Sequence, residues 1–255
     1  MKFSFNILLL LVYSISSLTI SAQSIITDRP DQTESAVTLE AGRLQIESGV
    51  LNQSQGKGLD RLRSLIIPTN LFRYGISKKV ELRMVLQLDG EKTNADKYHQ
   101  FALGNVEIGA KFVLNKKVDP AVQLAILSHI RLPKDNWVNF RENLGFLNRV
   151  SIAHRVGKFL NIGYNFGYNH YTKGYGNFVY TLAVGAGITN RISIYVEPYG
   201  DITTDSSPTS NFDYGVAYLI NPNIQLDLSF GLGLNNKMSY QSVGISWRQK
   251  TKETP

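Results

Sequence analysis

The sequence predicts an all-β protein, an antiparallel up-and-down transmembrane β-barrel of about twelve strands. The first observation is alternation: residues 80–88 (VELRMVLQL) and 224–232 (IQLDLSFGL) carry an apolar residue at every even position. Side chains on a strand point alternately to its two faces, so each stretch has one apolar and one mostly polar face. A tilted strand of about 9–11 residues can cross a membrane. The pattern recurs along nearly the whole chain and indicates a wall between lipid and water.

The second observation is that short and long connections alternate. Short connections are expected at residues 77–79, 115–119, 157–158, 189–191 and 221–223. Longer ones are expected at 53–62, 90–102, 132–146, 172–177 and 202–210, with one of intermediate length at 234–238. Outer-membrane barrels have this layout, with tight turns in the periplasm and long loops outside. A soluble β-sandwich has no reason to segregate its connections by length.

Between these connections twelve strands are expected, at residues 42–52, 63–76, 80–89, 103–114, 120–131, 147–156, 159–171, 178–188, 192–201, 211–220, 224–233 and 239–249. An even number places both chain ends in the periplasm. Pro68 cannot donate to the ladder, so the second strand is expected to carry a bulge or a register change. The first and last strands must pair, because an open edge in hydrocarbon would leave backbone groups unsatisfied.

The two faces of these strands have different expected surroundings. The apolar rows contain no charge, and a charge at the bilayer midplane would cost roughly 2–4 kcal/mol. The opposite face is expected to line the lumen with acids and bases together, namely Glu47, Arg73, Glu81, Arg83, Glu107, Lys111, Arg131, Arg149, Arg155, Glu197, Asp213 and Asp227. Two interpretations stay open: a salt-bridged filling that holds a narrow barrel in shape, or a conduction path that selects solutes by charge. Twelve strands lie between filled barrels of about eight strands and open porins of about sixteen, so any pore should be narrow.

The chain begins with the features of a secretory signal peptide. Lys2 precedes an apolar run that fades into serines and ends at Ser21-Ala22, which predicts cleavage before Gln23. The expected organisation is a signal peptide at 1–22, a periplasmic N-terminal segment at 23–41, an outer-membrane barrel at 42–250 and a polar tail at 251–255. The expected location is the outer membrane of a Gram-negative cell.

The segment at 23–41 does not have a strand pattern. It gathers four charged residues around Pro30, namely Asp28, Arg29, Asp31 and Glu34. One hypothesis is that the segment folds into the periplasmic mouth and pairs with luminal charges such as Arg73, Arg83 and Glu81, partly plugging the barrel. The alternative is a disordered leader.

Little in the sequence indicates catalysis or a cofactor. The chain has no cysteine, which excludes disulfides and thiolate metal sites, and its four histidines lack metal-ligand spacing. Its net charge is +7, but it has no blocks of like charge, so nucleic-acid binding is not expected. Ser128 and His129, and likewise Ser151 and His154, fall on opposite strand faces. No catalytic, cofactor-binding or metal-binding residue is therefore expected, although a serine–histidine pair across strands stays open.

Several segments resemble a bacterial outer-membrane family described as Putative MetA-pathway of phenol degradation. They are residues 26–35 (ITDRPDQTES), 42–49 (GRLQIESG), 72–76 (FRYGI), 80–83 (VELR), 104–111 (GNVEIGAK), 223–228 (NIQLDL) and 243–248 (VGISWR). The resemblance implies an outer-membrane barrel and uptake of aromatic or hydrophobic compounds. One departure is that Trp247-Arg248 is followed by a polar tail, whereas the family often ends soon after this pair.

The function expected from these observations is passive, cofactor-free uptake of small solutes, among them aromatic or hydrophobic ones, by a monomeric barrel. The expected partners are outer-membrane lipid and lipopolysaccharide, the barrel-assembly machinery and a small-molecule solute. Two alternatives stay open: a barrel enzyme that hydrolyses lipids, and a non-conducting structural or adhesion barrel that presents its long loops.

Overall fold

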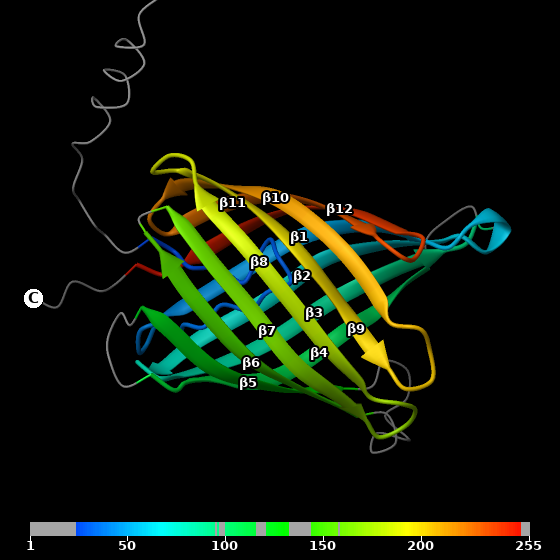
Figure 1. Ribbon diagram of the computed structural model, residues 1–255, viewed down its shortest axis with the longest axis horizontal. Coiled ribbons are helices and arrows are strands. Elements are labelled where there is room, and N and C mark those ends of the chain that lie inside the picture. The colour runs from blue at the N-terminus through cyan, green and yellow to red at the C-terminus, as the bar shows by residue number, and fades with distance from the viewer. Residues whose placement is uncertain are drawn as a thin grey trace, which may run out of the picture.

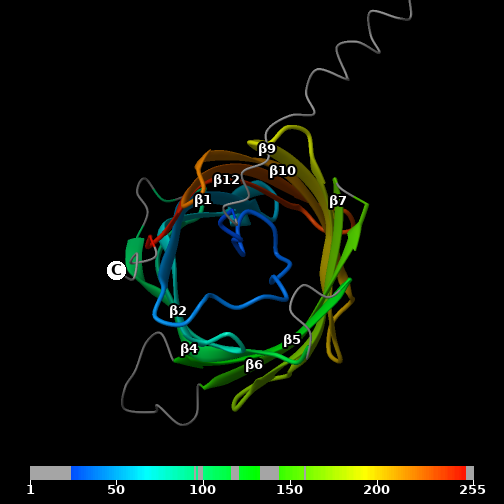
Figure 2. The same cartoon turned by 90° about the vertical axis from the view of Figure 1, so that its left-hand side faces the viewer.

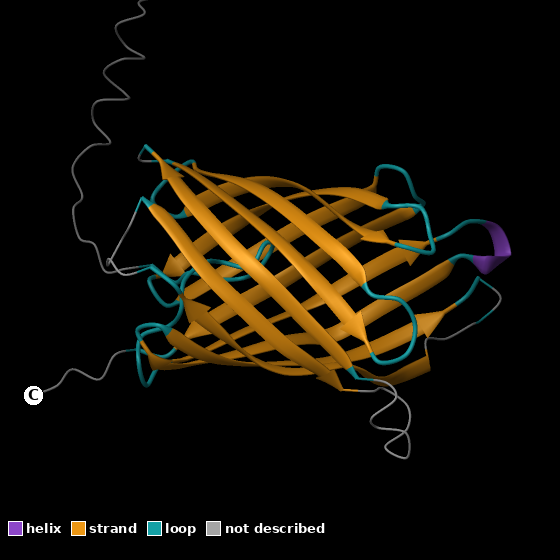
Figure 3. Ribbon diagram, turned by 60° about the horizontal axis from the view of Figure 1, so that its bottom comes forward, coloured by secondary structure: helices purple, strands orange, loops and turns teal. Residues whose placement is uncertain are grey.

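In the computed structural model, the alternating segments form one antiparallel sheet that closes on itself (Figure 1). The structure describes residues 24–94, 96, 100–115, 121–132, 144–157 and 159–250. The expected signal peptide and polar tail lie outside the described residues, as does most of the long connection at 132–146. The strands slant across the barrel, with loops at both ends (Figure 3).

The twelve expected strands are confirmed, and each boundary lies within three residues of the expected one. They are β1 (Leu44–Gln55), β2 (Leu62–Ser77), β3 (Val80–Lys92), β4 (Gln100–Val113), β5 (Val122–Leu132), β6 (Gly145–Val156), β7 (Leu160–Tyr171), β8 (Asn177–Gly187), β9 (Ile192–Thr203), β10 (Thr209–Asn221), β11 (Ile224–Gly233) and β12 (Met238–Arg248). A short 3-10 helix, η1 (Gly58–Asp60), lies between β1 and β2. No helix in the described part of the chain is long and apolar enough to cross a membrane.

Closure and irregularity both follow the expectation. β1 pairs with β12 from Gln45 opposite Arg248 to Gln55 opposite Met238, so the sheet has no free edge. The register of β2 shifts against β3 between Ile66 and Thr69, on either side of Pro68. The expected irregularity at this proline is therefore confirmed, because its nitrogen has no proton to donate to the ladder.

The two faces of the sheet reverse the pattern of a soluble protein. Outward side chains are apolar and exposed, such as Ile108 at 55% and Phe166 at 56%. Inward side chains are charged and buried, and Arg73, Glu81 and Glu197 each have 0% exposure. This arrangement suits a sheet with hydrocarbon outside and polar groups within.

A charge on the outer face should therefore destabilise the barrel. We expect Ile108→Lys, near the middle of β4, to lower the free energy of unfolding by roughly 2–4 kcal/mol in lipid vesicles. Asn161→Lys, at an exposed inward position of β7, should change it little. Urea titration of vesicle-inserted protein measures both values. Equal losses for the two variants would contradict the assignment of the faces.

Residues 24–43, here called the inner segment, run inside the barrel before β1 begins (Figure 2). The segment is fixed at the end of the barrel where β1 begins and β12 ends. There the Ile25 amide donates to the carbonyl of Pro222 at 2.9 Å. It leaves the lumen where the Gly75 amide donates to the carbonyl of Arg43 at 3.0 Å. A side chain at residue 75 would collide with the Glu40 carbonyl oxygen, so this crossing requires glycine.

Candidate functional site

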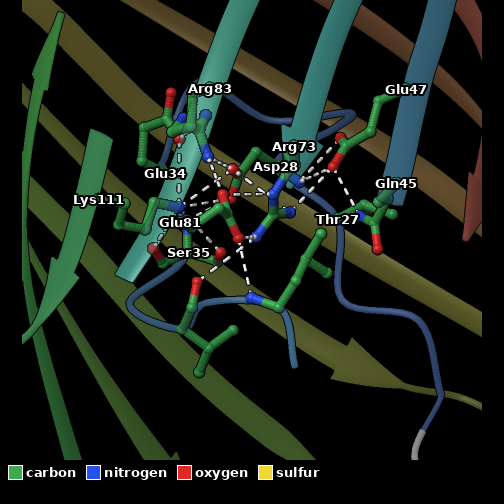
Figure 4. Close-up of polar contacts among 12 residues, drawn as sticks. Thr27, Asp28, Glu34, Ser35, Gln45, Glu47, Arg73, Glu81, Arg83 and Lys111 are labelled. Carbon is green, nitrogen blue, oxygen red and sulfur yellow. Dashed lines mark hydrogen bonds and ion pairs between the residues drawn. The ribbon is translucent and has the colours of Figure 1, made fainter. Parts of the chain in front are cut away.

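The carboxylate of Asp28 lies between three cations of the barrel wall (Figure 4). Its Oδ2 is 2.6 Å from a guanidinium nitrogen of Arg83, 3.1 Å from the Lys111 ammonium and 3.4 Å from Arg73. These cations come from β3, β4 and β2, three adjacent strands. Asp28 is 9% exposed. Its partners Arg73, Arg83 and Lys111 all have odd numbers, and odd-numbered residues of these strands point into the barrel.

The wall residues around Asp28 carry one excess positive charge. Arg73, Arg83 and Lys111 face two wall carboxylates, Glu47 and Glu81, and Arg73 contacts both acids at 2.9 and 2.8 Å. The inner segment supplies two further carboxylates. The second is Glu34, which lies 2.7 Å from Arg83 and 3.5 Å from Lys111. The anchor cluster is defined here as Asp28, Glu34, Glu47, Arg73, Glu81, Arg83 and Lys111.

The surroundings of Asp28 favour its ionised form. Burial raises the pKa of its carboxyl, but Arg73, Lys111 and Arg83 lower it more, so the pKa lies well below its ordinary value. A carboxylate that stays ionised inside the barrel holds all three wall cations at once. The anchor cluster therefore fixes the inner segment against β2–β4.

A second set of contacts, made by Arg29, fixes the inner segment against β11, β12 and β2. Arg29 donates to Asp227 of β11 at 2.9 Å and to the hydroxyls of Thr69 and Ser242 at 3.1 and 2.9 Å. The Arg29 amide also donates to Glu47 at 3.0 Å. The sequence hypothesis named Arg73, Arg83 and Glu81 as partners of the segment. Arg73 and Arg83 contact the segment through Asp28, and Glu81 accepts the Leu39 amide at 2.9 Å. The pairing of Arg29 with Asp227 was not among the named contacts.

Residues 31–33, here called the tip, reach the middle of the barrel, deeper than the periplasmic mouth. The Gln32 amide donates to Glu197 Oε2 at 2.6 Å, and the Thr33 hydroxyl contacts Glu197 Oε1 at 2.5 Å and Thr181 at 2.6 Å. Thr33 also packs against Gly163 of β7, where an added Cβ would lie 3.1 Å from its methyl group. The tip therefore lies against three adjacent strands, β7, β8 and β9.

The tip carries a carboxylate without a cation. No ion pair joins Asp31 to any described residue. Burial, followed by the charges of Glu197, Asp213 and Asp28, raises the pKa of Asp31 well above its ordinary value. Two aspartates three residues apart thus experience opposite environments, Asp28 among cations and Asp31 among acids.

A cavity of about 190 Å³, here called the side cavity, lies between the inner segment and the wall of β5–β9. Five of the wall residues there are small, namely Ala121, Ala153, Gly163, Ala183 and Gly185. Polar residues also line it, including Thr27, Thr33, Ser35, Gln123, Asn161 and Tyr195. The lumen is thus packed on the β1–β4 side and hollow on the β5–β9 side.

The other lumen residues predicted from the sequence make contacts outside the anchor cluster. Glu107 lies among His129 at 2.9 Å and Arg131 at 2.8 Å, and the Arg83 Nε–H donates to the second ring nitrogen of His129 at 3.2 Å. Arg149 donates to Asn169 at 2.8 Å. Arg155 is exposed and lines the side cavity. The structure therefore brings Asp28, Arg29 and Glu34 of the inner segment together with the wall.

Several polar residues of the site were not predicted. Gln45, His129, Ser242 and Tyr240 all point inward, and their positions in alternating strands could have placed them there. Gln32 and Thr33 carry no charge and lie outside any strand pattern, so no sequence signal marked them as contacts of Glu197.

The described residues contain no arrangement typical of a hydrolase or a metal site. No serine hydroxyl among them hydrogen-bonds a histidine: Ser128 donates to Asn148 at 2.8 Å on the outer face, while His129 contacts Glu107 inside. His154 contacts the hydroxyl of Tyr164 at 3.0 Å. Within the described ranges, no group of three or more histidines, aspartates and glutamates could hold a metal ion.

The chain was compared with known families and structures. The model of the family described as Putative MetA-pathway of phenol degradation matches residues 27–248. The COG4313 outer membrane channel from Pseudomonas putida F1 has a similar structure, with a TM-score of 0.68 and 10% identity over 84% of this chain and 98% of that one. No curated protein matches the chain.

Two porins have the same fold. The NanC porin gives a TM-score of 0.55 and 10% identity over 78% of this chain and 98% of its own. The KdgM porin, solved in complex with disordered oligogalacturonate, gives 0.54 and 12% identity over 80% of this chain and 98% of its own. At these identities the likeness shows the shared outer-membrane barrel fold.

Proposed function

This chain belongs to the family described as Putative MetA-pathway of phenol degradation, and from this premise we propose that it is a passive outer-membrane channel for small solutes. The observation that carries the proposal is the side cavity, a hollow space of mixed polar and apolar lining beside the tip of the inner segment. The barrels of similar structure are described as channels and porins, which supports the same function.

Passage through such a lumen requires no covalent step. A solute entering the side cavity exchanges part of its hydration shell for hydroxyl and amide groups of the wall and of the inner segment. Ala153, Ala183 and Gly185 leave room for it, because each presents one methyl group or none. The anchor cluster keeps the inner segment on the far side, so the segment narrows the lumen and sets the size of solute that fits.

The family description suggests small aromatic compounds as solutes. The side cavity offers an aromatic ring, Tyr195, together with the hydroxyls of Thr27, Thr33 and Ser35. A phenol-like solute has an apolar ring and a hydroxyl that both donates and accepts hydrogen bonds. Such a solute matches a cavity with these two kinds of lining.

Filling the side cavity should block the channel. Gly185 points into it, and a Cβ added there would have no atom closer than 3.7 Å. We expect Gly185→Trp to reduce single-channel conductance in planar bilayers several-fold, because the indole would occupy the hollow side. The matched control is Ala186→Trp, one residue away on the outer face of β8. A native protein that never conducts would overturn the proposed function, and conduction unaffected by Gly185→Trp would overturn this route.

A second candidate is a non-conducting structural barrel, favoured by the number of contacts that hold the inner segment across the lumen. Conductance measured on the native chain separates the two. A barrel-type lipid hydrolase finds no support in the serine and histidine contacts described above.

Location and partners form part of the same proposal. The chain would be exported by residues 1–22, cleaved before Gln23 and inserted by the barrel-assembly machinery as a monomer. Its apolar outer face would contact lipid and lipopolysaccharide. N-terminal sequencing of protein recovered from outer membranes tests the cleavage.

A further inference from the structure

Three carboxyl groups meet at the tip of the inner segment. Glu197 of β9 and Asp213 of β10 are directly opposed in the strand register, and both have 0% exposure. Asp31 adds a third carboxyl from the tip. These three residues, here called the acidic cluster, form no ion pair with any described arginine, lysine or histidine. The anchor cluster, by contrast, gives each of its carboxylates a cation.

The polar groups that face Glu197 and Asp213 are also without positive charge, while His154 and Arg155 line the side cavity beside Asp31. Tyr195 and Tyr199 face it from β9, and the Tyr240 hydroxyl of β12 donates to Asp213 Oδ2 at 2.5 Å. Thr181 of β8 and Asn165 of β7 carry no titratable group. On β11 the nearest charge, Asp227, is paired with Arg29, and within the inner segment Asp28 and Glu34 are paired with the anchor cations.

Two buried oxygens at this place have no hydrogen-bond partner among the described residues. They are Oδ1 of Asp213 and the hydroxyl of Tyr195. Two adjacent buried carboxylates cannot both ionise without strong repulsion, and one proton held between them removes it. The missing cation and the free oxygen of Asp213 both point to a proton as the bound species.

Glu197 also accepts two hydrogen bonds from the tip. The protonation state of Glu197 and Asp213 can therefore control where the tip lies in the lumen. We propose that Glu197 and Asp213 share a proton which latches the tip against β9, and that loss of this proton frees the tip and widens the side cavity between the inner segment and β7–β9. The inference rests on the proposed channel function.

The direction follows from the charges. With the proton in place, Glu197 and Asp213 together repel Asp31 weakly, and Gln32 and Thr33 stay bonded to Glu197. As the pH rises, a second wall carboxylate ionises close to Asp31, whose own pKa is already raised by burial and by Glu197. A charged Glu197 strengthens the hydrogen bonds that it accepts from Gln32 and Thr33. The charges of Glu197 and Asp213 then both repel Asp31 in a low-dielectric site. Repulsion prevails, and the tip leaves.

The test is single-channel conductance of the mature chain in planar bilayers between about pH 5 and about pH 9, a range above the titration of ordinary aspartates. The native protein should change from a small to a several-fold larger conductance as the pH rises. Asp213→Asn, which keeps an acceptor for Tyr240 but removes the second charge, should stay small throughout. Glu197→Ala, which removes the acceptor of the tip, should stay large throughout.

Asp201→Asn is the matched control, because it makes the same change in charge on β9 outside the cluster, and it should keep the native response. An Asp213→Asn channel with the native pH response would overturn the latch, as would a Glu197→Ala channel that stays small. A native channel that conducts equally at every pH would also sink the latch while leaving the channel function intact. A barrel with no conductance at any pH would sink both.

Discussion

Asp28→Asn is expected to free the inner segment from the barrel wall and to raise single-channel conductance several-fold. The substitution removes the charge of the inner segment that contacts Arg73, Arg83 and Lys111 together. Breaking a buried ion pair by removing one partner costs about 3–5 kcal/mol. Glu34, Glu47 and Glu81 still face the three cations, but only Glu34 among them belongs to the inner segment. Limited proteolysis in detergent should then cleave within residues 24–43, and planar-bilayer recordings should show the larger conductance.

Asp31→Asn is the control, since it makes the same chemical change three residues away. Asp31 lies among acids, so its neutralisation should leave the inner segment at least as firmly held and the conductance no larger than in the native protein. Equal release by both substitutions would contradict the anchor, because it would mean that any change in the segment frees it.

The native protein should show the same release in acid. The pKa of Asp28 is depressed in the folded state, so its contribution to stability is complete above the ordinary aspartate value of about 3.9 and is lost as the pH falls through the folded value. The anchor therefore weakens only below about pH 4. The acidic cluster acts in the opposite direction and at higher pH, so the inner segment should be held most firmly between these two limits.

The strands, their faces and the closure of the barrel could be predicted because each depends on a local rule. A period of two assigns Arg73 and Glu81 to the lumen, and hydrocarbon forbids a free edge next to β1 or β12. Pro68 predicts the register shift in β2, because proline lacks an amide proton for the ladder. These rules need only the neighbouring sequence.

The partners inside the lumen could not be predicted in the same way. Alternation places Asp227 inside the barrel, but its height there depends on the shear of the whole sheet, which no single strand encodes. For this reason the sequence did not predict the pairing of Arg29 with Asp227 or the contact of the tip with Glu197. A list of inward charges contains both signs and so does not reveal that cations gather around Asp28 while acids gather around Asp31.

The largest loss of stability is expected from Arg73→Met. Arg73 donates to Glu81 at 2.8 Å, to Glu47 at 2.9 Å and to the carbonyl of Ile26 at 3.1 Å, so one side chain joins β1, β2, β3 and the inner segment. Methionine fills part of the space of the aliphatic stem but donates no hydrogen bond. The two wall glutamates then share only the remaining cations, and the free energy of unfolding should fall by about 3–5 kcal/mol.

Urea titration of the refolded barrel in detergent measures this loss, and Arg63→Met supplies the matched control. Arg63 lies on the same strand but is exposed, so the side chain leaves no buried carboxylate behind when it is removed, and its loss should change stability by less than about 1 kcal/mol. Replacing both partners of a buried ion pair with apolar residues often leaves stability unchanged or raises it. Arg73→Met tests the other case, in which three carboxylates lose one shared cation. Equal stability of the two variants would mean that water reaches Glu47 and Glu81 inside the barrel.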